Sequence, residues 1–482
     1  MRKKFAINLI ILIAANLLVK PIWVLGIDRV VQNNVGPEVY GPYFAVFNYS
    51  FLFNVIIDFG VNNFNNRAIS RNNKRVGEYM YNLLVIKGIL SLVYLAVTFA
   101  AALPSGIEPT EMKMLFFLCL NQILLYFVLY FRSSIAALQM FKTDSVISVL
   151  DRLLSIIFCV VLIYAEPFKG GFDIMWFIYA QSVALFITML AGALVLVGKA
   201  KINFKLWRFK FIRSILWKSA PFAMLGLMMG IYSRIGAVMI KSMLVDGGYE
   251  TGVYAAGFRL LDSVNMFGYM FATLLLPLFA SMIRQRQNIQ PLVVLSSDLL
   301  YVGSVAIGSV CFFFNKEIML LLYPDSNAYW WNVFGWLMLT FIPIASVYVY
   351  GTLLTAYGNL KMLNSIAIAG AFFNVGLNLY MIPAYGAWGA TVATLVTQGL
   401  VALAHIVVAT RQFNFKIEAK EILKLSAYTI IAVAGVYAVR YVPVHWFVQM
   451  CLGGVVCGIA ILALQIIPIS GLMAIVKSKA TS

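Results

Sequence analysis

Long apolar stretches separated by short polar or charged segments recur from one end of the chain to the other. A helix needs about 20 apolar residues to cross a ~30 Å hydrocarbon core, and these stretches have that length. The pattern therefore predicts an all-α, polytopic membrane protein with fourteen spans and no large soluble domain. The predicted spans are 5–26, 40–64, 79–103, 112–138, 146–164, 174–198, 218–240, 252–281, 291–314, 330–357, 362–382, 387–410, 425–439 and 446–473.

The basic residues between these spans follow an alternating pattern. Every second loop, together with both ends of the chain, contains Lys or Arg, often in clusters, whereas the intervening loops hold one basic residue or none. Cytoplasmic loops carry this excess, so we expect both termini in the cytoplasm. The first span follows Met1-Arg-Lys-Lys4 but lacks a small-x-small cleavage site, which favours an uncleaved anchor over a signal peptide.

Composition supports the membrane assignment and excludes other classes. The 482 residues are 62% hydrophobic and 11% charged, whereas a soluble domain is about half apolar and about a quarter charged. The net charge of +18 lies mostly in short loops and comes with no nucleic-acid-binding motif, so we expect no nucleic-acid partner. Two histidines and five cysteines scattered in apolar runs predict no metal site, and we expect no cofactor.

An internal repeat relates the two halves of the chain. Gly41-Pro-Tyr43-Phe-Ala45 opens the second span and Gly252-Val-Tyr254-Ala-Ala256 opens the eighth, while 137–142 and 356–361 form a second similar pair. Both members of the first pair run inward, which indicates two six-helix lobes related by a parallel pseudo-twofold axis. The predicted parts are an N-lobe (1–198), a basic cytoplasmic linker (199–217), a C-lobe (218–410), and two further helices with a tail (411–482).

Three basic residues are predicted in the outer half of the membrane, namely Lys20, Arg234 and Arg259. Lys20 and Arg234 occupy corresponding helices of the two lobes, so a cleft between the lobes would receive a cation from each wall. A cavity with excess positive charge suits an anion such as a phosphate or diphosphate, which makes these residues the substrate-binding candidates. Alternatively, Lys20 extends to the interface and Arg259 is neutralised by Asp262, three residues further on.

Two carboxylates inside predicted spans, Asp58 and Asp262, are candidates for a coupling-ion or proton site, because a carboxylate in a low-dielectric cleft can change its protonation. Asp58 lies near the cytoplasmic end of its span, where pairing with a basic loop residue is the simpler interpretation. Lys87 and Arg132 lie in inner halves of spans, where contacts with lipid headgroups or loops compete with substrate contacts.

Polar residues at helical spacing indicate an aqueous interior, because a lipid-facing surface would not tolerate them. The predicted cavity-lining residues are Asn54, Gln122, Tyr126, Asn374 and Asn378. For Asn374 and Asn378, hydrogen bonding between helices is an alternative explanation.

Several segments resemble polysaccharide transporters. The eleventh and twelfth spans contain Ala371-Phe-Phe-Asn374-Val-Gly376-Leu-Asn378, followed by Ile382-Pro383-Ala-Tyr385-Gly386-Ala-Trp-Gly389-Ala390. The segments Gly36–Tyr43 with Asp58-Phe-Gly60, and Gly252–Leu260 with Pro277, match the patterns of the second and eighth helices. The chain thus resembles O-antigen and capsule flippases of the multidrug/oligosaccharidyl-lipid/polysaccharide (MOP) exporter superfamily.

That resemblance implies a V-shaped pair of lobes that works by alternating access in a bacterial cytoplasmic membrane. The implied activity is movement of an undecaprenyl-diphosphate-linked oligosaccharide from the inner to the outer leaflet. Lys20, Arg234 and Arg259 would then line the cationic cavity typical of such flippases. The implied partners are membrane lipid and polysaccharide assembly enzymes. We expect the protein to be a monomer and not an enzyme.

Other functions are weighed against this one. The Arg-Asp pair in the first helix of lipid II flippases has no counterpart here, which disfavours that substrate. A multidrug or cation antiporter of the same superfamily would require an acidic cavity to bind its substrates. A polysaccharide polymerase or ligase would require a larger outer loop with catalytic groups. The chain lacks the Gly-rich Lys-Ser/Thr loop of ATPases, so a gradient or substrate supply would drive transport.

Overall fold

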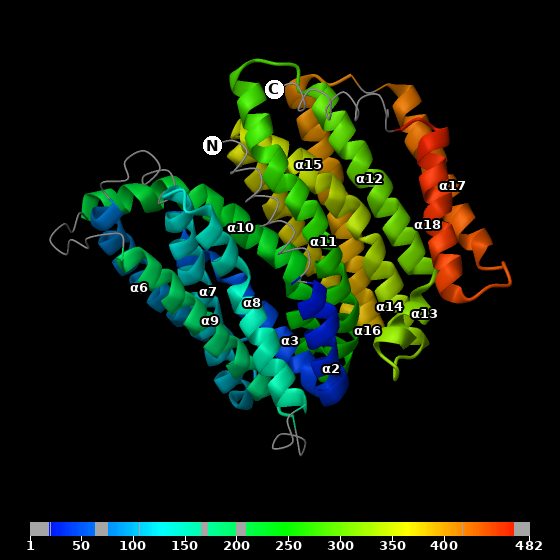
Figure 1. Cartoon of the computed structure of the whole chain (residues 1–482). Coiled ribbons are helices and arrows are strands. Elements are labelled where there is room, and N and C mark those ends of the chain that lie inside the picture. The colour runs from blue at the N-terminus through cyan, green and yellow to red at the C-terminus, as the bar shows by residue number, and fades with distance from the viewer. Residues whose placement is uncertain are drawn as a thin grey trace. The chain divides into compact units, whose positions relative to one another are not determined.

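The computed structural model describes residues 19, 21–62, 76–105, 107–164, 172–198, 209–416 and 418–466. Within these ranges all regular structure is helical, and 11 helices are long and apolar enough to cross a membrane. The prediction of an all-α polytopic fold is therefore confirmed. Contacts divide the chain into two compact units, Met1–Ala255 and Ala256–Ser482 (Figure 1).

The first unit contains a bundle in which α7 packs against α9 and α3, and α8 packs against α9. Its elements are the π-helix η1 (Ile22–Asp28), α2 (Arg29–Val35), α3 (Pro37–Leu52), α4 (Val55–Asp58), α6 (Val76–Ala102), the 3₁₀ turn η3 (Pro109–Glu111), α7 (Met112–Ala137), α8 (Phe141–Tyr164), α9 (Ile174–Val197) and α10 (Phe209–Met243). The long α11 (Gly247–Arg284) begins in this unit and continues into the second.

The second unit is organised around α12, which packs against α14, α15 and α17. Its elements after α11 are α12 (Gln290–Phe313), α13 (Asn315–Leu322), α14 (Ala328–Leu339), α15 (Phe341–Tyr357), α16 (Leu360–Phe413), α17 (Ala419–Val439) and α18 (Trp446–Ala463). The Tyr428 hydroxyl on α17 donates to the Val302 carbonyl at 2.9 Å, which fixes α17 to α12.

Each predicted span from the second onward has a helix at its position, with boundaries shifted by a few residues. The second span is interrupted and forms α3 and α4, the tenth is divided into α14 and α15, and the eleventh and twelfth are joined in α16. Most of the first span, the linker up to residue 208 and everything after residue 466 lie outside the described residues.

The second span breaks near its C-terminal end because two successive residues adopt left-handed backbone conformations. Phe59 has φ 42° and Gly60 has φ 80°, which ends α4 directly after Asp58. A Cβ at Gly60 would also lie 2.5 Å from the Ser219 hydroxyl oxygen. Glycine avoids both the backbone strain and this contact, so it allows the chain to turn inside a predicted span.

The reversal between the eleventh and twelfth spans occurs at Gly386, with φ 59° and ψ −139°. This conformation is accessible almost only to glycine, and Pro383 precedes it by three residues. A Cβ at Gly389 would lie 2.2 Å from the Met381 carbonyl oxygen, so the two arms approach closely just beside the turn.

The start of the second span packs against the start of the eighth through backbone atoms. A Cβ at Gly41 would lie 1.9 Å from the Gly248 carbonyl oxygen and 2.7 Å from the Gly252 nitrogen, and a Cβ at Gly252 would lie 2.3 Å from the Pro37 carbonyl oxygen. The Gln32 side-chain amide donates to the Gly252 carbonyl at 3.0 Å. We call Gly41, Gly248 and Gly252 the glycine seam; it brings the two members of the predicted repeat into direct contact.

Substitution of Gly41 by alanine tests the seam. The new methyl group would meet backbone atoms that cannot rotate away, so we expect destabilisation by about 1–3 kcal/mol, as for overpacking of a core. The control is Gly230→Ala on α10, where nothing lies within 4 Å and alanine favours the helix. Thermal unfolding of the purified protein measures the stability of both variants. Equal midpoints for the two variants would contradict backbone contact at the seam.

Candidate functional site

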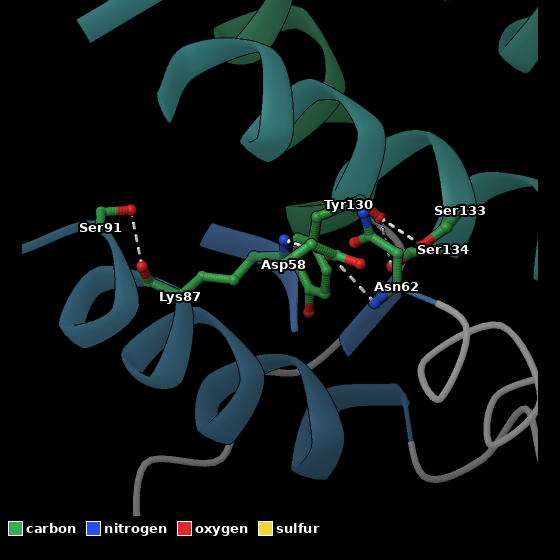
Figure 2. Close-up of polar contacts among 7 residues, drawn as sticks. All are labelled: Asp58, Asn62, Lys87, Ser91, Tyr130, Ser133 and Ser134. Atoms are coloured by element: carbon green, nitrogen blue, oxygen red, sulfur yellow. Dashed lines mark hydrogen bonds and ion pairs between the residues drawn. The ribbon is translucent and has the colours of Figure 1, made fainter. Parts of the chain in front are cut away.

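The first unit contains a buried ion pair beside the break that follows α4. The Lys87 ammonium on α6 donates to Asp58 Oδ1 at 2.9 Å, and the exposed fractions of the two side chains are 0% and 18%. The backbone N–H of Asn62 donates to the same carboxylate oxygen at 3.2 Å. Figure 2 shows Lys87 extending from its helix towards Asp58, which lies where α4 ends. The pair thus joins the broken end of the second span to the third.

Two tyrosines of α7 complete the surroundings of the ammonium. Lys87 Nζ lies 5.7 Å from the centre of the Tyr126 ring and 5.8 Å from that of Tyr130, within the range of cation–π attraction. Tyr130 also belongs to an apolar cluster with Leu83 and Ile86. An ammonium in such surroundings is stable only with its counter-ion, so Asp58 and Lys87 depend on each other.

Asp58 therefore pairs with Lys87, a residue of the third predicted span. The basic residues of the loop after the second span, which were the other candidate partners of Asp58, lie outside the described residues. Lys87, for which lipid or loop contacts were considered, is enclosed by protein. Arg132 pairs with Asp144 at the start of α8, with Nε 2.8 Å from Oδ1. Whether Asp58 acts as a coupling site remains a proposal.

Arg234 on α10 is held against α3. Its guanidinium donates to Asn48 Oδ1 at 3.1 Å and lies over the Phe51 ring, with 4.6 Å between Cζ and the ring centre. Asn48 is itself 1% exposed and donates to the Phe44 carbonyl at 2.7 Å, so its amide is fixed in orientation. The half-buried guanidinium thus has a defined position within a span.

Of the other two predicted cations, Lys20 lies outside the described residues, and Arg259 lies in the second unit, half-buried on α11. Asp262 is also half-buried one turn further along that helix. The shared cationic cavity expected from the sequence thus remains a prediction.

Three of the predicted cavity-lining residues lie in the first unit. Asn54 is 7% exposed at the turn between α3 and α4, and Gln122 on α7 is 4% exposed. The Gln122 side-chain oxygen is buried without a hydrogen-bond partner in the described part of the chain. Tyr126 contacts Lys87, so it belongs to the ion-pair site.

Asn374 and Asn378 are both buried within the two arms of α16. Asn374 Nδ2 donates to the Thr397 hydroxyl at 3.1 Å, and Asn378 Nδ2 donates to Asn374 Oδ1 at 2.9 Å. The bond to Thr397 links the predicted eleventh and twelfth spans and favours interhelical hydrogen bonding for Asn374, whereas the bond between Asn378 and Asn374 lies within one arm.

A second ion-pair group lies beside the glycine seam and was not recognised in the sequence. Lys241 Nζ at the end of α10 lies 2.8 Å from Glu111 Oε2 and 3.5 Å from Glu108 Oε1. Both glutamates belong to the turn η3, where they form a reciprocal capping box. The group connects the loop before α7 to α10, and we call it the outer ion-pair group.

No cluster of three or more His, Cys, Asp or Glu side chains suited to a metal ion occurs among the described residues.

Comparison with solved structures shows the fold. The structure aligns with "Lipid II flippase MurJ, inward closed conformation" at a TM-score of 0.73 and 14% identity, covering 94% of this chain and 98% of that one. An inward-facing multidrug resistance MATE family transporter of the MOP superfamily gives 0.63 and 16%, covering 84% and 98%. A MOP superfamily transporter from Pyrococcus furiosus gives 0.57 and 17%, covering 85% and 93%. Comparison with curated proteins finds no match.

A family model for polysaccharide biosynthesis proteins matches residues 5–283, more than half of the 482 residues. The solved structures show the fold, and this match shows the family. The chain is a multi-pass membrane protein that belongs to the polysaccharide biosynthesis protein family.

Proposed function

We propose that this protein moves a polyprenyl-diphosphate-linked oligosaccharide from the inner to the outer leaflet of a bacterial cytoplasmic membrane by alternating access. Family membership supports a role in polysaccharide assembly, and the fold supports transport. In this proposal both termini are cytoplasmic, the protein works as a monomer, and assembly enzymes are its protein partners.

The observation that carries the proposal is the fixed position of Arg234 within a span. A charged side chain inside a membrane is unfavourable, so such residues mark substrate or ion pathways. The planar guanidinium forms paired hydrogen bonds with phosphate oxygens, which a diphosphate headgroup offers. Contacts with Asn48 and Phe51 hold the guanidinium in place before substrate arrives. Lys20 and Arg259 are proposed to contribute to the same headgroup site.

The contacts around the glycine seam support alternating access. Gly41 and Glu111 lie in the predicted N-lobe, whereas Gly248 and Lys241 lie in the predicted C-lobe. By the predicted topology all of them lie on the outer side. Two lobes joined here would be closed to the outside, so we infer that both the seam and the outer ion-pair group separate when the substrate is released.

The buried pair of Asp58 and Lys87 is the proposed coupling element of the first unit, and Asp262 is the candidate in the second. Asp58 retains 18% side-chain exposure, so a proton has access to it, while Lys87 has none. Protonation of Asp58 would leave a buried ammonium without a counter-ion, which would force a rearrangement of α4, α6 and α7.

The transport proposal is tested by glycolipid translocation in reconstituted vesicles. We expect Arg234→Gln to lower the initial rate by roughly 10–100-fold, the effect of losing a charge-assisted hydrogen bond of about 1.5–3 kcal/mol. Arg284→Gln, which removes an exposed arginine at the end of α11, is the control and should leave the rate unchanged. Unaltered translocation in Arg234→Gln would exclude the proposed headgroup contact. Efflux of cationic drugs without glycolipid movement would instead indicate an antiporter.

The role of the buried pair is tested by neutralising its members singly and together. Asp58→Asn and Lys87→Met should each destabilise the protein by about 3–5 kcal/mol, because each leaves one buried charge unpaired. The double variant should recover most of the lost stability, as measured by thermal unfolding. If the pair couples transport to protons, the stable double variant should translocate substrate without responding to a pH gradient; a wild-type response would assign the pair a structural role only.

Opening of the seam is tested by a reversible cross-link. Pro42 Cγ lies 3.5 Å from a Cβ built at Gly248, so cysteines at positions 42 and 248 are close enough for a disulfide. In a background without the native cysteines, oxidation should stop translocation and reduction should restore it. Cysteines at positions 131 and 192 are the control, because both lie in the predicted N-lobe, where a Cβ at Gly192 is 3.0 Å from Phe131 Cβ. Normal transport by the oxidised 42–248 pair would refute separation of the seam.

A further inference from the structure

A groove lies between α8 and α9, and neither the ion pair nor Arg234 belongs to its lining. It has a volume of about 370 Å³ and is lined by Lys142, Thr143, Val146, Leu150, Ala191 and Val195. The two helices run in opposite directions, so the first turns of α8 lie beside the last turns of α9. Lys142 is in the first turn of α8, and Leu150 and Ala191 lie deeper in the span.

The groove lies on a surface that faces hydrocarbon. Around it α8 and α9 expose apolar side chains, including Val146 with 62% exposure and Leu194 with 72%. Such exposure on two membrane-spanning helices identifies a lipid-facing surface. Ala191 is the smallest side chain of the lining, and its size leaves the hollow between the larger residues of the two helices.

Among the residues that line the groove, Lys142 carries a positive charge at the polar end. Lys142 is exposed and forms no ion pair with any residue that the structure describes. The nearby carboxylate of Asp144 is neutralised by Arg132, so it does not cancel the charge of Lys142. The Thr143 hydroxyl lies at the same end. The predicted topology places this end at the cytoplasmic interface.

We propose that the groove binds an anionic phospholipid of the cytoplasmic leaflet. The lipid phosphate contacts Lys142 and Thr143, and one acyl chain lies along Val146, Leu150, Ala191 and Val195. Charge complementarity selects an anionic headgroup, and the apolar floor selects a chain-bearing molecule over a free anion. The proposal concerns a bilayer lipid and is independent of the transported substrate.

The test measures lipid retained by the purified full-length protein, with native mass spectrometry, after equilibration with phosphatidylglycerol or phosphatidylcholine of the same chain length. The wild type should retain phosphatidylglycerol preferentially. Lys142→Gln should lower that preference roughly fivefold, because one lysine near an anionic surface contributes about 1 kcal/mol. Ala191→Phe should reduce retention of both lipids by filling the groove.

Lys361→Gln is the matched control. Lys361 is also exposed, occupies the equivalent position in the second predicted repeat, and has the same predicted side of the membrane. It should leave the preference unchanged. Equal losses from Lys142→Gln and Lys361→Gln would show unspecific attraction and overturn the proposal, as would no loss from either. Lys142→Arg should retain the preference, which separates loss of charge from misfolding.

A last arm distinguishes a lipid from a free anion. Millimolar inorganic phosphate should not displace phosphatidylglycerol if the acyl chain contributes to binding. Complete displacement by phosphate, together with unchanged retention in Ala191→Phe, would make the site a simple anion site and contradict lipid binding.

Discussion

The structure depends on one constraint: inside the membrane, polar and charged groups must find partners within the protein. Hydrocarbon offers no hydrogen bonds, so a broken helix within a span is tolerated only where protein groups replace the missing ones. At the break after α4, the Phe59 N–H donates to the Val55 carbonyl at 3.0 Å and the Asn62 N–H donates to Asp58. Asp58 thus satisfies a freed backbone group and the Lys87 ammonium together, which ties the break to the ion pair.

The same constraint changes what holds helices together. Between membrane helices the hydrophobic effect contributes little, and close packing of small residues and interhelical hydrogen bonds take its place. The glycine seam shows the first and the Asn374–Thr397 bond shows the second. Contacts at the seam include close apposition of backbone atoms and an amide hydrogen bond from Gln32.

Much of the fold follows from the sequence because length and hydropathy of a span are local properties. The positions of α6 to α12 and of α14 to α18 follow from apolar stretches, whereas the short α13 lies between two predicted spans. The left-handed turns at Gly60 and Gly386 coincide with glycines quoted for the family resemblance. The sequence also predicts how deep a residue lies in the membrane: Asp58 lies about 9 Å and Lys87 about 12 Å from the cytoplasmic ends of their predicted spans. Their pairing was not predicted, because lateral adjacency and helix rotation depend on contacts between distant segments. For the same reason, the sequence did not identify Asn48 as the partner of Arg234.

The two ion-pair groups differ in how far water reaches them. Glu108 in the outer group is 66% exposed, so water can replace its contact with Lys241, and this contact contributes about 1 kcal/mol or less. The contact between Lys241 and Glu111 is more protected, with exposed fractions of 11% and 10%. Lys87 is fully enclosed, so separating it from Asp58 costs several kcal/mol, about 3–5 kcal/mol for a buried pair. We therefore expect α4, α6 and α7 to move as one body around the pair of Asp58 and Lys87. It follows that Asp58 can change its charge during transport only if Lys87 changes its own charge or its position in the same step.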